Sequence, residues 1–292
     1  MTASQTAVRT RFAPAPTGYL HLGHVANATW VWGMARQTGA RVLLRIEDHD
    51  RVRCRPEYDA ALLEDLAWLG FVADTGPLRQ SDDDAPYQGA LETLRAAGLV
   101  YGCDCSRSTF DAWAVANGRE WAGAGCPGGC RERGLDGPVL RVVLGGGKER
   151  WMDGFVGPCE GEVSASGDPP IRDRHGNWTY TFAVVVDDLW QGVDLVVRGR
   201  DLLESTPAQI RLDSLLGGDA PATFAHHGLV RRPDGRKLSK GDGATGIREL
   251  RAAGRRAPAV IGEAAAAIGL IDAPRAIEAT EVAALFPQPA AD

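Results

Sequence analysis

The stretch that decides the fold is VRTRFAPAPTGYLHLGHVANATWVWGMARQTGARVLLRI, residues 8–46. Its first segment, Val8–Phe12, predicts a strand, and two prolines and a glycine in residues 13–18 prevent regular structure after it. A helical pattern follows over about Gly23–Gln37, and a second apolar strand covers Ala40–Ile46. A strand, a loop, a helix and a strand in this order predict an α/β fold with a Rossmann-type, doubly wound parallel sheet.

The rest of the chain repeats this pattern around one interruption. Apolar residues at helical spacing predict helices over Tyr58–Leu69 and Pro207–Leu216, and Phe224–Val230 is typical of a buried strand. Between about residues 101 and 174, cysteines, glycines and short strands replace the α/β pattern, which indicates an insertion. We therefore expect a first Rossmann half at 1–100, an inserted α+β subdomain at 101–175, a second Rossmann half at 176–245 and a short helical segment at 246–292.

The composition favours an ordinary globular protein. The formal net charge of the 292-residue chain is -6, which argues against a protein that coats nucleic acid by general electrostatics. The sequence contains no run of the roughly 18 apolar residues that a membrane span requires. The polar start, Met1–Arg11, lacks the apolar core of a signal peptide. We therefore expect a cytoplasmic protein without a membrane partner.

His21 and His24 are three residues apart at the expected start of a helix, so both can face one ligand. A helix N-terminus offers unpaired N–H groups and a partial positive charge, which suit phosphate. Gly23 removes a side chain where a nucleotide base can lie against the backbone. The two imidazoles can donate hydrogen bonds to phosphoryl oxygens as charge builds in a transition state. Taken alone, these residues are equally well explained as a chance pair of surface histidines.

Lys237 and Lys240 belong to a second short motif, Lys-Leu-Ser-Lys, followed by Gly-Asp-Gly. Two ammonium groups on a glycine-flanked loop can close over a triphosphate. By itself, this motif is better interpreted as a solvated turn. The order of the motifs along the predicted sheet changes that interpretation, because the histidine motif follows the first strand and the lysine motif follows a late one. Together they predict one ATP site.

This arrangement resembles the class I aminoacyl-tRNA synthetases, with their HIGH and KMSKS signatures. The glutamyl-tRNA synthetase branch is the closer likeness, and it rests on residues 11–24, 45–48, 180–188 and 197–207. The resemblance runs from about Arg11 to Leu250. It implies that Mg²⁺-bound ATP activates glutamate as glutamyl-adenylate and that the glutamate is then transferred to a tRNA hydroxyl. The implied catalytic and ATP-binding residues are His21, Gly23, His24, Lys237 and Lys240.

The same resemblance implies how glutamate is bound. A γ-carboxylate requires a positive, preferably forked donor, and an α-ammonium requires a carboxylate. The implied glutamate-binding residues are Arg11, Phe12, Ala13, Pro14, Ala15, Glu47, Tyr180 and Arg198. The family often has serine where this chain has Ala15, so only the backbone can contribute there. Without the resemblance, an ordinary ion pair and a core tyrosine are the better interpretations of Glu47 and Tyr180.

Four of the six cysteines lie within 28 residues, at Cys103, Cys105, Cys126 and Cys130. In a cytosolic chain such a cluster favours a metal over disulfides. Four thiolates are enough for a closed tetrahedral Zn²⁺ site, which leaves no open position for chemistry. We therefore expect one structural zinc that orders the insertion; four buried or free thiols are the alternative.

The length of the chain and its cysteines indicate which kind of glutamyl-tRNA synthetase relative it resembles. Only 52 residues follow Lys240 (292 minus 240), whereas a full glutamyl-tRNA synthetase continues into a longer helical anticodon-binding region. The chain looks like a shorter paralogue without that region, in which a tyrosine commonly stands at the position of Cys126. This likeness implies that the acceptor is queuosine at the wobble position of tRNA(Asp). We also expect a monomer.

Three alternatives remain at this stage. A truncated glutamyl-tRNA synthetase would charge the 3′ end of tRNA(Glu). A small nucleotidyltransferase, such as a relative of pantetheine-phosphate adenylyltransferase, would explain the two histidines but neither the cysteines nor the lysine motif. A catalytically inactive RNA-binding paralogue tends to lose motif residues, whereas this chain keeps both motifs.

Overall fold

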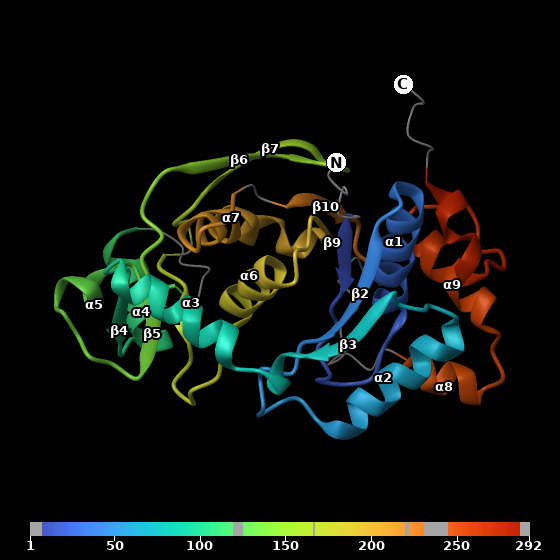
Figure 1. Cartoon of the computed structure of the whole chain (residues 1–292), viewed down its shortest axis with the longest axis horizontal. Helices are drawn as coiled ribbons and strands as arrows, with labels where there is room; N and C mark the ends of the chain where they lie inside the picture. The colour runs from blue at the N-terminus through green and yellow to red at the C-terminus, as the bar shows by residue number, and fades with distance from the viewer. Residues whose placement is uncertain (1–7, 119–124, 166, 220–221, 231–244, 287–292) are drawn as a thin grey trace, which may run out of the picture.

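The computed structural model describes residues 8–118, 125–165, 167–219, 222–230 and 245–286 (Figure 1). Strand β1 (Arg9–Phe12) leads through an irregular loop into helix α1 (Leu22–Thr38), and strand β2 (Arg41–Ile46) follows. The helix ends at Gly39, whose φ of 72° is the left-handed conformation that glycine adopts without strain. β1 and β2 pair in parallel, which confirms the predicted strand–helix–strand unit.

Within the described residues, the main sheet has seven strands in the order β3-β2-β1-β9-β10-β6-β7. Neighbouring strands are parallel except for the antiparallel edge pair β6 and β7. The other strands are β3 (Thr75–Arg79), β6 (Lys148–Asp153), β7 (Gly157–Glu162), β9 (Leu195–Gly199) and β10 (Thr223–His227). The strand order reverses between β1 and β9, and ligands of doubly wound sheets bind at the carboxyl ends of the strands at such a point.

Helices cover both faces of this sheet, as the sequence predicts for a doubly wound fold (Figure 1). Leu195 and Val197 of β9 pack into the core around α1, whereas Val196 between them packs with Ile210 on the other face. The helices of the α1 side are α2 (Pro56–Leu69), α8 (Ile247–Ala252), α9 (Ala257–Ala267) and the 3-10 helix η4 (Ala279–Leu285). A second group of helices packs together in a separate hydrophobic cluster. It consists of α3 (Ala85–Ala96), α6 (Tyr180–Trp190) and α7 (Thr206–Leu215).

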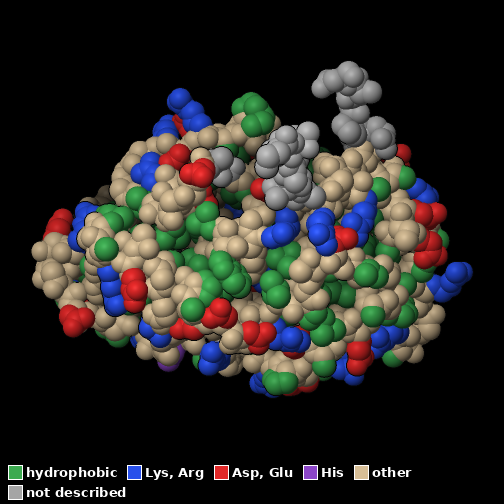
Figure 2. All heavy atoms as spheres, viewed as in Figure 1, with side chains coloured by type: hydrophobic (Ala, Val, Ile, Leu, Met, Phe, Trp, Pro, Cys, Tyr) green, Lys and Arg blue, Asp and Glu red, His purple; other side chains and the backbone are tan. Residues whose placement is uncertain are grey.

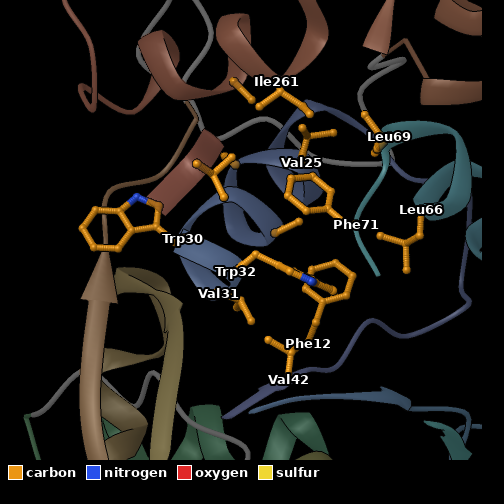
Figure 3. Packing of buried hydrophobic residues seen from close by; sticks show 14 of the residues in the cluster. Phe12, Val25, Trp30, Val31, Trp32, Val42, Leu66, Leu69, Phe71 and Ile261 are labelled. Carbon is orange, nitrogen blue, oxygen red and sulfur yellow. The ribbon is translucent and has the colours of Figure 1, made fainter. Parts of the chain in front are cut away.

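The core beneath α1 is rich in aromatic residues (Figure 3). Phe12 of β1 lies 5.3 Å from Trp32 of α1, and Trp32 lies 5.0 Å from Phe71, measured between ring centroids. Large rings in tilted contact bury much apolar area at the start of the β1 loop. This packing fixes the position of α1 on the sheet and therefore the position of its N-terminus.

The inserted subdomain contains a small antiparallel sheet of β4 (Val100–Cys103), β5 (Val139–Val142) and β8 (Pro170–Arg172). Helices α4 (Arg107–Ala116) and α5 (Gly129–Glu132) pack beside it, and the 3-10 helices η1 (Gln80–Asp82) and η2 (Arg200–Ser205) lie in the Rossmann part. Strands β6 and β7 fall inside the range expected for the insertion, but they extend the main sheet. The domain boundaries themselves stay a prediction.

The surface is mixed in charge. On the face shown in Figure 2, Lys and Arg side chains are interspersed with Asp and Glu side chains. No described helix is both long and apolar enough to cross a bilayer.

Candidate active site

A cavity of about 490 Å³ opens at the carboxyl ends of β1, β2, β9 and β10, where the strand order reverses. The N-terminus of α1 forms one wall of it. The sequence-predicted residues that line this cavity are Phe12, Ala13, Pro14, Ala15, His21, Gly23, His24, Glu47 and Tyr180. Residues that are far apart in the sequence are thus brought to one site.

His21 and His24 cap the first turn of α1 with their side chains. The Nδ1 atom of His21 accepts a hydrogen bond from the backbone N–H of Gly23 at 3.1 Å. The Nδ1 atom of His24 accepts one from the backbone N–H of His21 at 3.0 Å. An imidazole that accepts at Nδ1 carries its proton on Nε2 when it is neutral. Both rings can therefore offer an Nε2–H donor at a helix N-terminus that already favours anions.

Gly23 is required by this arrangement for a local reason. A Cβ atom at Gly23 would lie 2.9 Å from Cε1 of His21, which is closer than side-chain carbons normally approach. A side chain there would displace the His21 ring and break the reciprocal cap. The glycine thus protects the histidine geometry in addition to leaving space on the cavity wall.

Arg11 lies behind the cavity in a buried ion-pair network and does not line the cavity itself. Its Nε atom donates to Asp188 at 3.1 Å, and Arg45 donates from NH1 to the same carboxylate at 2.8 Å. Burial opposes the ionisation of Asp188, but the two guanidinium groups overcome that effect and lower its pKa. Asp188 therefore holds both arginines in place as a carboxylate.

Arg45 is fully buried and also contacts two further acidic groups. Its NH2 atom lies 3.2 Å from Glu47, and its Nε atom lies 3.5 Å from Asp187. Burial raises the pKa of Glu47 and of Asp187, and Arg45 offsets this only in part. Two arginines and three carboxylates sum to a charge of -1 when all are ionised. Glu47 reaches the cavity wall, so this excess negative charge suits an ammonium group in the cavity.

Arg198 of β9 is also buried behind the cavity, beside Tyr180. Its Nε atom donates to Nε2 of His226 at 3.0 Å, and its NH1 atom donates to Gln209 at 2.6 Å. Arg198 also interacts with the Tyr180 hydroxyl, and burial raises the pKa of that phenol. The structure thus brings Arg11, Arg198 and Glu47 around Tyr180, on the inner side of the cavity.

Lys237 and Lys240 lie outside the described residues. The described chain resumes at residue 245, and it meets the histidine motif at once. Gly246 forms a β-bridge with His21, and the backbone N–H of Ile247 donates to the carbonyl of Leu20 at 2.8 Å. The residues that follow the lysine motif are therefore tied to the residues that precede α1.

The four clustered cysteines form a second site in the insertion. Their Sγ atoms all lie within 4.8 Å of one another, with Cys105 at 4.0 Å from Cys126 and at 3.3 Å from Cys130. Four thiolates at about 2.3 Å from a tetrahedral ion would be about 3.8 Å apart. The donor set and its spacing therefore fit a metal ion, as the sequence predicts.

Polar groups favour the thiolate form of Cys126, whereas burial raises the pKa of Cys103 and Cys105. Burial opposes ionisation of Cys126, but backbone N–H groups of Cys130 and Gly128 overcome it, so its pKa is lowered to about 7. Arg133 donates to Cys130 Sγ at 3.3 Å and also pairs with Asp104 at 3.2 Å. Such groups around a ligand set stabilise the charge that a metal site concentrates.

Comparison with known proteins agrees with this site. The family model described as "tRNA synthetases class I (E and Q), catalytic domain" matches residues 7–114 and 136–264. The chain belongs to this family. The match includes both signature motifs and every residue discussed for the cavity. The class I model leaves out residues 115–135, so Cys126 and Cys130 rest on the geometry of the cluster instead.

Relatives of two kinds match this class I chain. A glutamyl-Q tRNA(Asp) synthetase of Symbiobacterium thermophilum is 40% identical, with 94% of this chain and 91% of the relative covered. One of Rhodobacter capsulatus is 41% identical, with 84% and 95% covered. Glutamate--tRNA ligase 2 of Halorhodospira halophila is 38% identical, with 84% of this chain but only 54% of the ligase covered.

A solved structure agrees with the fold. The glutamate tRNA ligase of Elizabethkingia meningosepticum, crystallised with its amino acid, has a TM-score of 0.78 and is 27% identical. The match covers 97% of this chain and 65% of that ligase. The chain thus spans less than two thirds of the solved ligase and about half of the full-length ligase among its sequence relatives.

Sequence reasoning missed several residues of this synthetase site. Asn27, Asp201 and His227 line the cavity, and His227 stacks on Trp30 with ring centroids 5.7 Å apart. Arg45 and Asp188, which hold Arg11, were quoted only as part of the family likeness. One available signal was position: His227 ends a parallel strand and Asp201 follows one, at the sheet edge where ligands bind.

Proposed function

We propose that this chain activates glutamate with ATP and transfers it to a tRNA hydroxyl. The observation that carries the proposal is a single cavity that combines two capped histidines at a helix N-terminus with Glu47 and Tyr180. The first pair suits phosphate, and the second pair suits an amino acid. Membership of the class I glutamyl and glutaminyl synthetase family supports the same reaction.

In the first step, an oxygen of the α-carboxylate of glutamate attacks the α-phosphorus of ATP. The bond from that phosphorus to the bridging oxygen breaks, and the products are glutamyl-adenylate and pyrophosphate. No protein nucleophile is needed, because positioning and charge stabilisation carry the reaction. His21 and His24 donate from Nε2 to phosphoryl oxygens as their charge grows. We assign the same electrostatic role to Lys237 and Lys240.

Glutamate itself is held as a dipolar molecule. The network around Arg45 carries an excess negative charge and reaches the cavity at Glu47, which suits the α-ammonium. Arg11 and Arg198 supply positive charge behind Tyr180, which suits the γ-carboxylate. Phe12, Ala13, Pro14 and Ala15 form the cavity wall between these two regions. The site therefore complements both charged ends of the substrate.

In the second step, an acceptor hydroxyl attacks the carbonyl carbon of the adenylate, and AMP leaves. We propose that this hydroxyl belongs to queuosine at the wobble position of tRNA(Asp). The support comes from relatives named for that reaction, which match over 91% and 95% of their own length. The matched glutamate--tRNA ligase is covered over only 54%, which makes transfer to tRNA(Glu) the second candidate.

The cofactors belong to the same proposal. Mg²⁺ would accompany ATP, and one structural Zn²⁺ would be held by Cys103, Cys105, Cys126 and Cys130. Zinc supplies no chemistry in this account, because four protein ligands close its coordination shell. It would cross-link β4 to α5 and order the insertion. We further propose that the enzyme is a cytoplasmic monomer.

Glutamate-dependent exchange between ATP and pyrophosphate tests the activation step. Wild-type protein should catalyse exchange with glutamate, and Lys240→Ala should abolish it while circular dichroism and melting temperature stay unchanged. Lys148→Ala is a suitable control, because Lys148 of β6 forms an exposed ion pair with Glu160 of β7. Unchanged exchange in Lys240→Ala would remove that loop from the mechanism. Absence of exchange in wild type would refute the proposed activation.

A further inference from the structure

The hydrogen-bond partners of Arg198 are all uncharged. Beyond His226 and Gln209, its NH2 atom donates to Thr206 Oγ1 at 2.9 Å and to the carbonyl of Leu202 at 3.4 Å. Phe224 lies under the guanidinium, 5.2 Å from the ring centroid. Within the described part of the chain, no carboxylate forms an ion pair with Arg198, and Asp188 acts on it only at longer range. This buried cation is therefore hydrogen-bonded without being neutralised.

The other two arginines of the site are held differently. Arg11 and Arg45 each bind the carboxylate of Asp188 directly, and Arg45 contacts Glu47 and Asp187 as well. Each of these two guanidinium groups therefore has at least one carboxylate as a direct partner. Arg198 differs from Arg11 and Arg45 because no carboxylate of the described residues pairs with it directly. Its positive charge is therefore available to a ligand. A buried charge without a direct partner is costly, so such an arrangement requires a role.

His226 is kept in the neutral form that Arg198 requires. Its Nδ1 atom lies 2.6 Å from Asp153 Oδ2, and its backbone N–H lies 3.2 Å from Asp153 Oδ1. Asp153 is itself fixed by the backbone N–H groups of Phe155 and Val156. A proton on Nδ1 leaves the lone pair of Nε2 for the Arg198 Nε–H. The Asp153 carboxylate thus sets the tautomer of His226, and the His226 ring separates that carboxylate from the Arg198 guanidinium.

Gln209 is a second uncharged partner of Arg198. It is buried, its Oε1 atom accepts from Arg198, and among the described residues its Nε2 atom has no hydrogen-bond partner. A glutamate of the same shape would accept that bond and would leave no unsatisfied donor. What glutamine provides instead is the absence of charge beside the guanidinium.

We propose that His226, Gln209 and Thr206 form a neutral cradle that positions Arg198 without cancelling its charge, and that this cradle makes the site select glutamate over glutamine. The inference rests on the proposed function, because it explains how the γ-carboxylate is distinguished from an amide. Substrate glutamate supplies the negative charge that the protein withholds. Glutamine would leave the buried cation unpaired and would bind less well.

The test adds one negative charge to the cradle with little change in shape. Gln209→Glu is compared with wild type, and Thr206→Asp is compared with the equally shaped Thr206→Asn. We expect both acidic variants to raise the KM for glutamate at least about tenfold, because a carboxylate against Arg198 repels and replaces the substrate carboxylate. The KM for ATP should stay within about twofold. The ratio of kcat/KM for glutamate to that for glutamine should fall by about the same factor as the KM rises.

Assays are run at mildly alkaline pH, where the added carboxyls are ionised beside the guanidinium. Calorimetry provides an independent readout: glutamate should raise the melting temperature of wild type and Thr206→Asn, and much less that of the acidic variants. If the acidic variants keep the wild-type KM for glutamate, or if Thr206→Asn shifts it as much as Thr206→Asp, the cradle has no role in selectivity. Absence of both exchange and glutamate-induced stabilisation in wild type would instead refute the proposed function, and this inference with it.

Discussion

The two nitrogens of His24 have separate tasks in this structure, and two substitutions can separate them. Nδ1 caps α1 by accepting from the His21 backbone N–H at 3.0 Å, and a neutral ring that accepts at Nδ1 carries a donor at Nε2 beside the cavity. The amide oxygen of asparagine stands near the position of Nδ1, so His24→Asn should keep the cap and lose the donor. The amide nitrogen of glutamine reaches the position of Nε2, so His24→Gln should keep the donor and lose the cap.

The expected sizes of the two effects differ. A lost N-terminal cap costs about 1 kcal/mol of folding free energy. For a chain of this size, that corresponds to a fall of roughly 2–4 °C in melting temperature. A lost donor to a developing phosphoryl charge costs a factor of about 100–1000 in rate. His24→Asn should therefore melt like wild type with a strongly reduced kcat, whereas His24→Gln should melt lower and retain more activity.

Calorimetry and glutamate-dependent ATP–pyrophosphate exchange measure the two effects on the same samples. His24→Ala serves as the reference, because it should show both losses together. The reasoning is wrong if His24→Asn melts as low as His24→Ala, since the cap would then not depend on an acceptor at Nδ1. It is equally wrong if His24→Gln is as inactive as His24→Asn.

Three further predictions concern stability and metal. A strong chelator should release one zinc per chain by metal analysis and lower the melting temperature, and Cys130→Ser should do the same without changing the KM for ATP. Burial lowers the pKa of His227 to about 4, so the unfolded chain binds the extra proton first. The unfolding free energy should thus fall by about 3 kcal/mol as pH drops from about 6.5 to 4, and urea titrations of His227→Phe should lack this component. Arg45→Met should cost about 3–5 kcal/mol in the same titrations, because it strands buried carboxylates. Arg36→Met, which breaks an exposed pair with Asp74, should cost less than about 1 kcal/mol.

Local patterns carried most of the fold that could be predicted. The strand, loop and helix around His21 were predicted within a few residues, because prolines, glycines and helical spacing act over short stretches. The cysteine cluster was predicted for the same reason, since the spacing of thiols is visible in the chain. The pairing of β6 with β10 was not predicted, because the two strands are about 70 residues apart and β6 lies in the interval expected for the insertion.

The site could be predicted only in part. Motif residues such as His24 and Glu47 were found through the family likeness, and the structure brings them to one cavity. The groups that hold Arg198 were missed, because they are distant from one another in sequence: His226 forms hydrogen bonds with Arg198 and Asp153, and Asp153 is 73 residues from His226. A buried chain of hydrogen bonds between such distant residues produces no periodic pattern in the sequence. The roles assigned to Lys237 and Lys240 still rest on sequence.

The acceptor is the central claim, and one labelling measurement tests it most directly. The protein is incubated with ATP, labelled glutamate and, separately, tRNA(Asp) with queuosine, tRNA(Asp) without queuosine, and tRNA(Glu). The account predicts label only in the queuosine-containing tRNA(Asp), and retention of that label in the anticodon-loop fragment after nuclease digestion. Label in tRNA(Glu), or at the 3′ end of either tRNA, would contradict it.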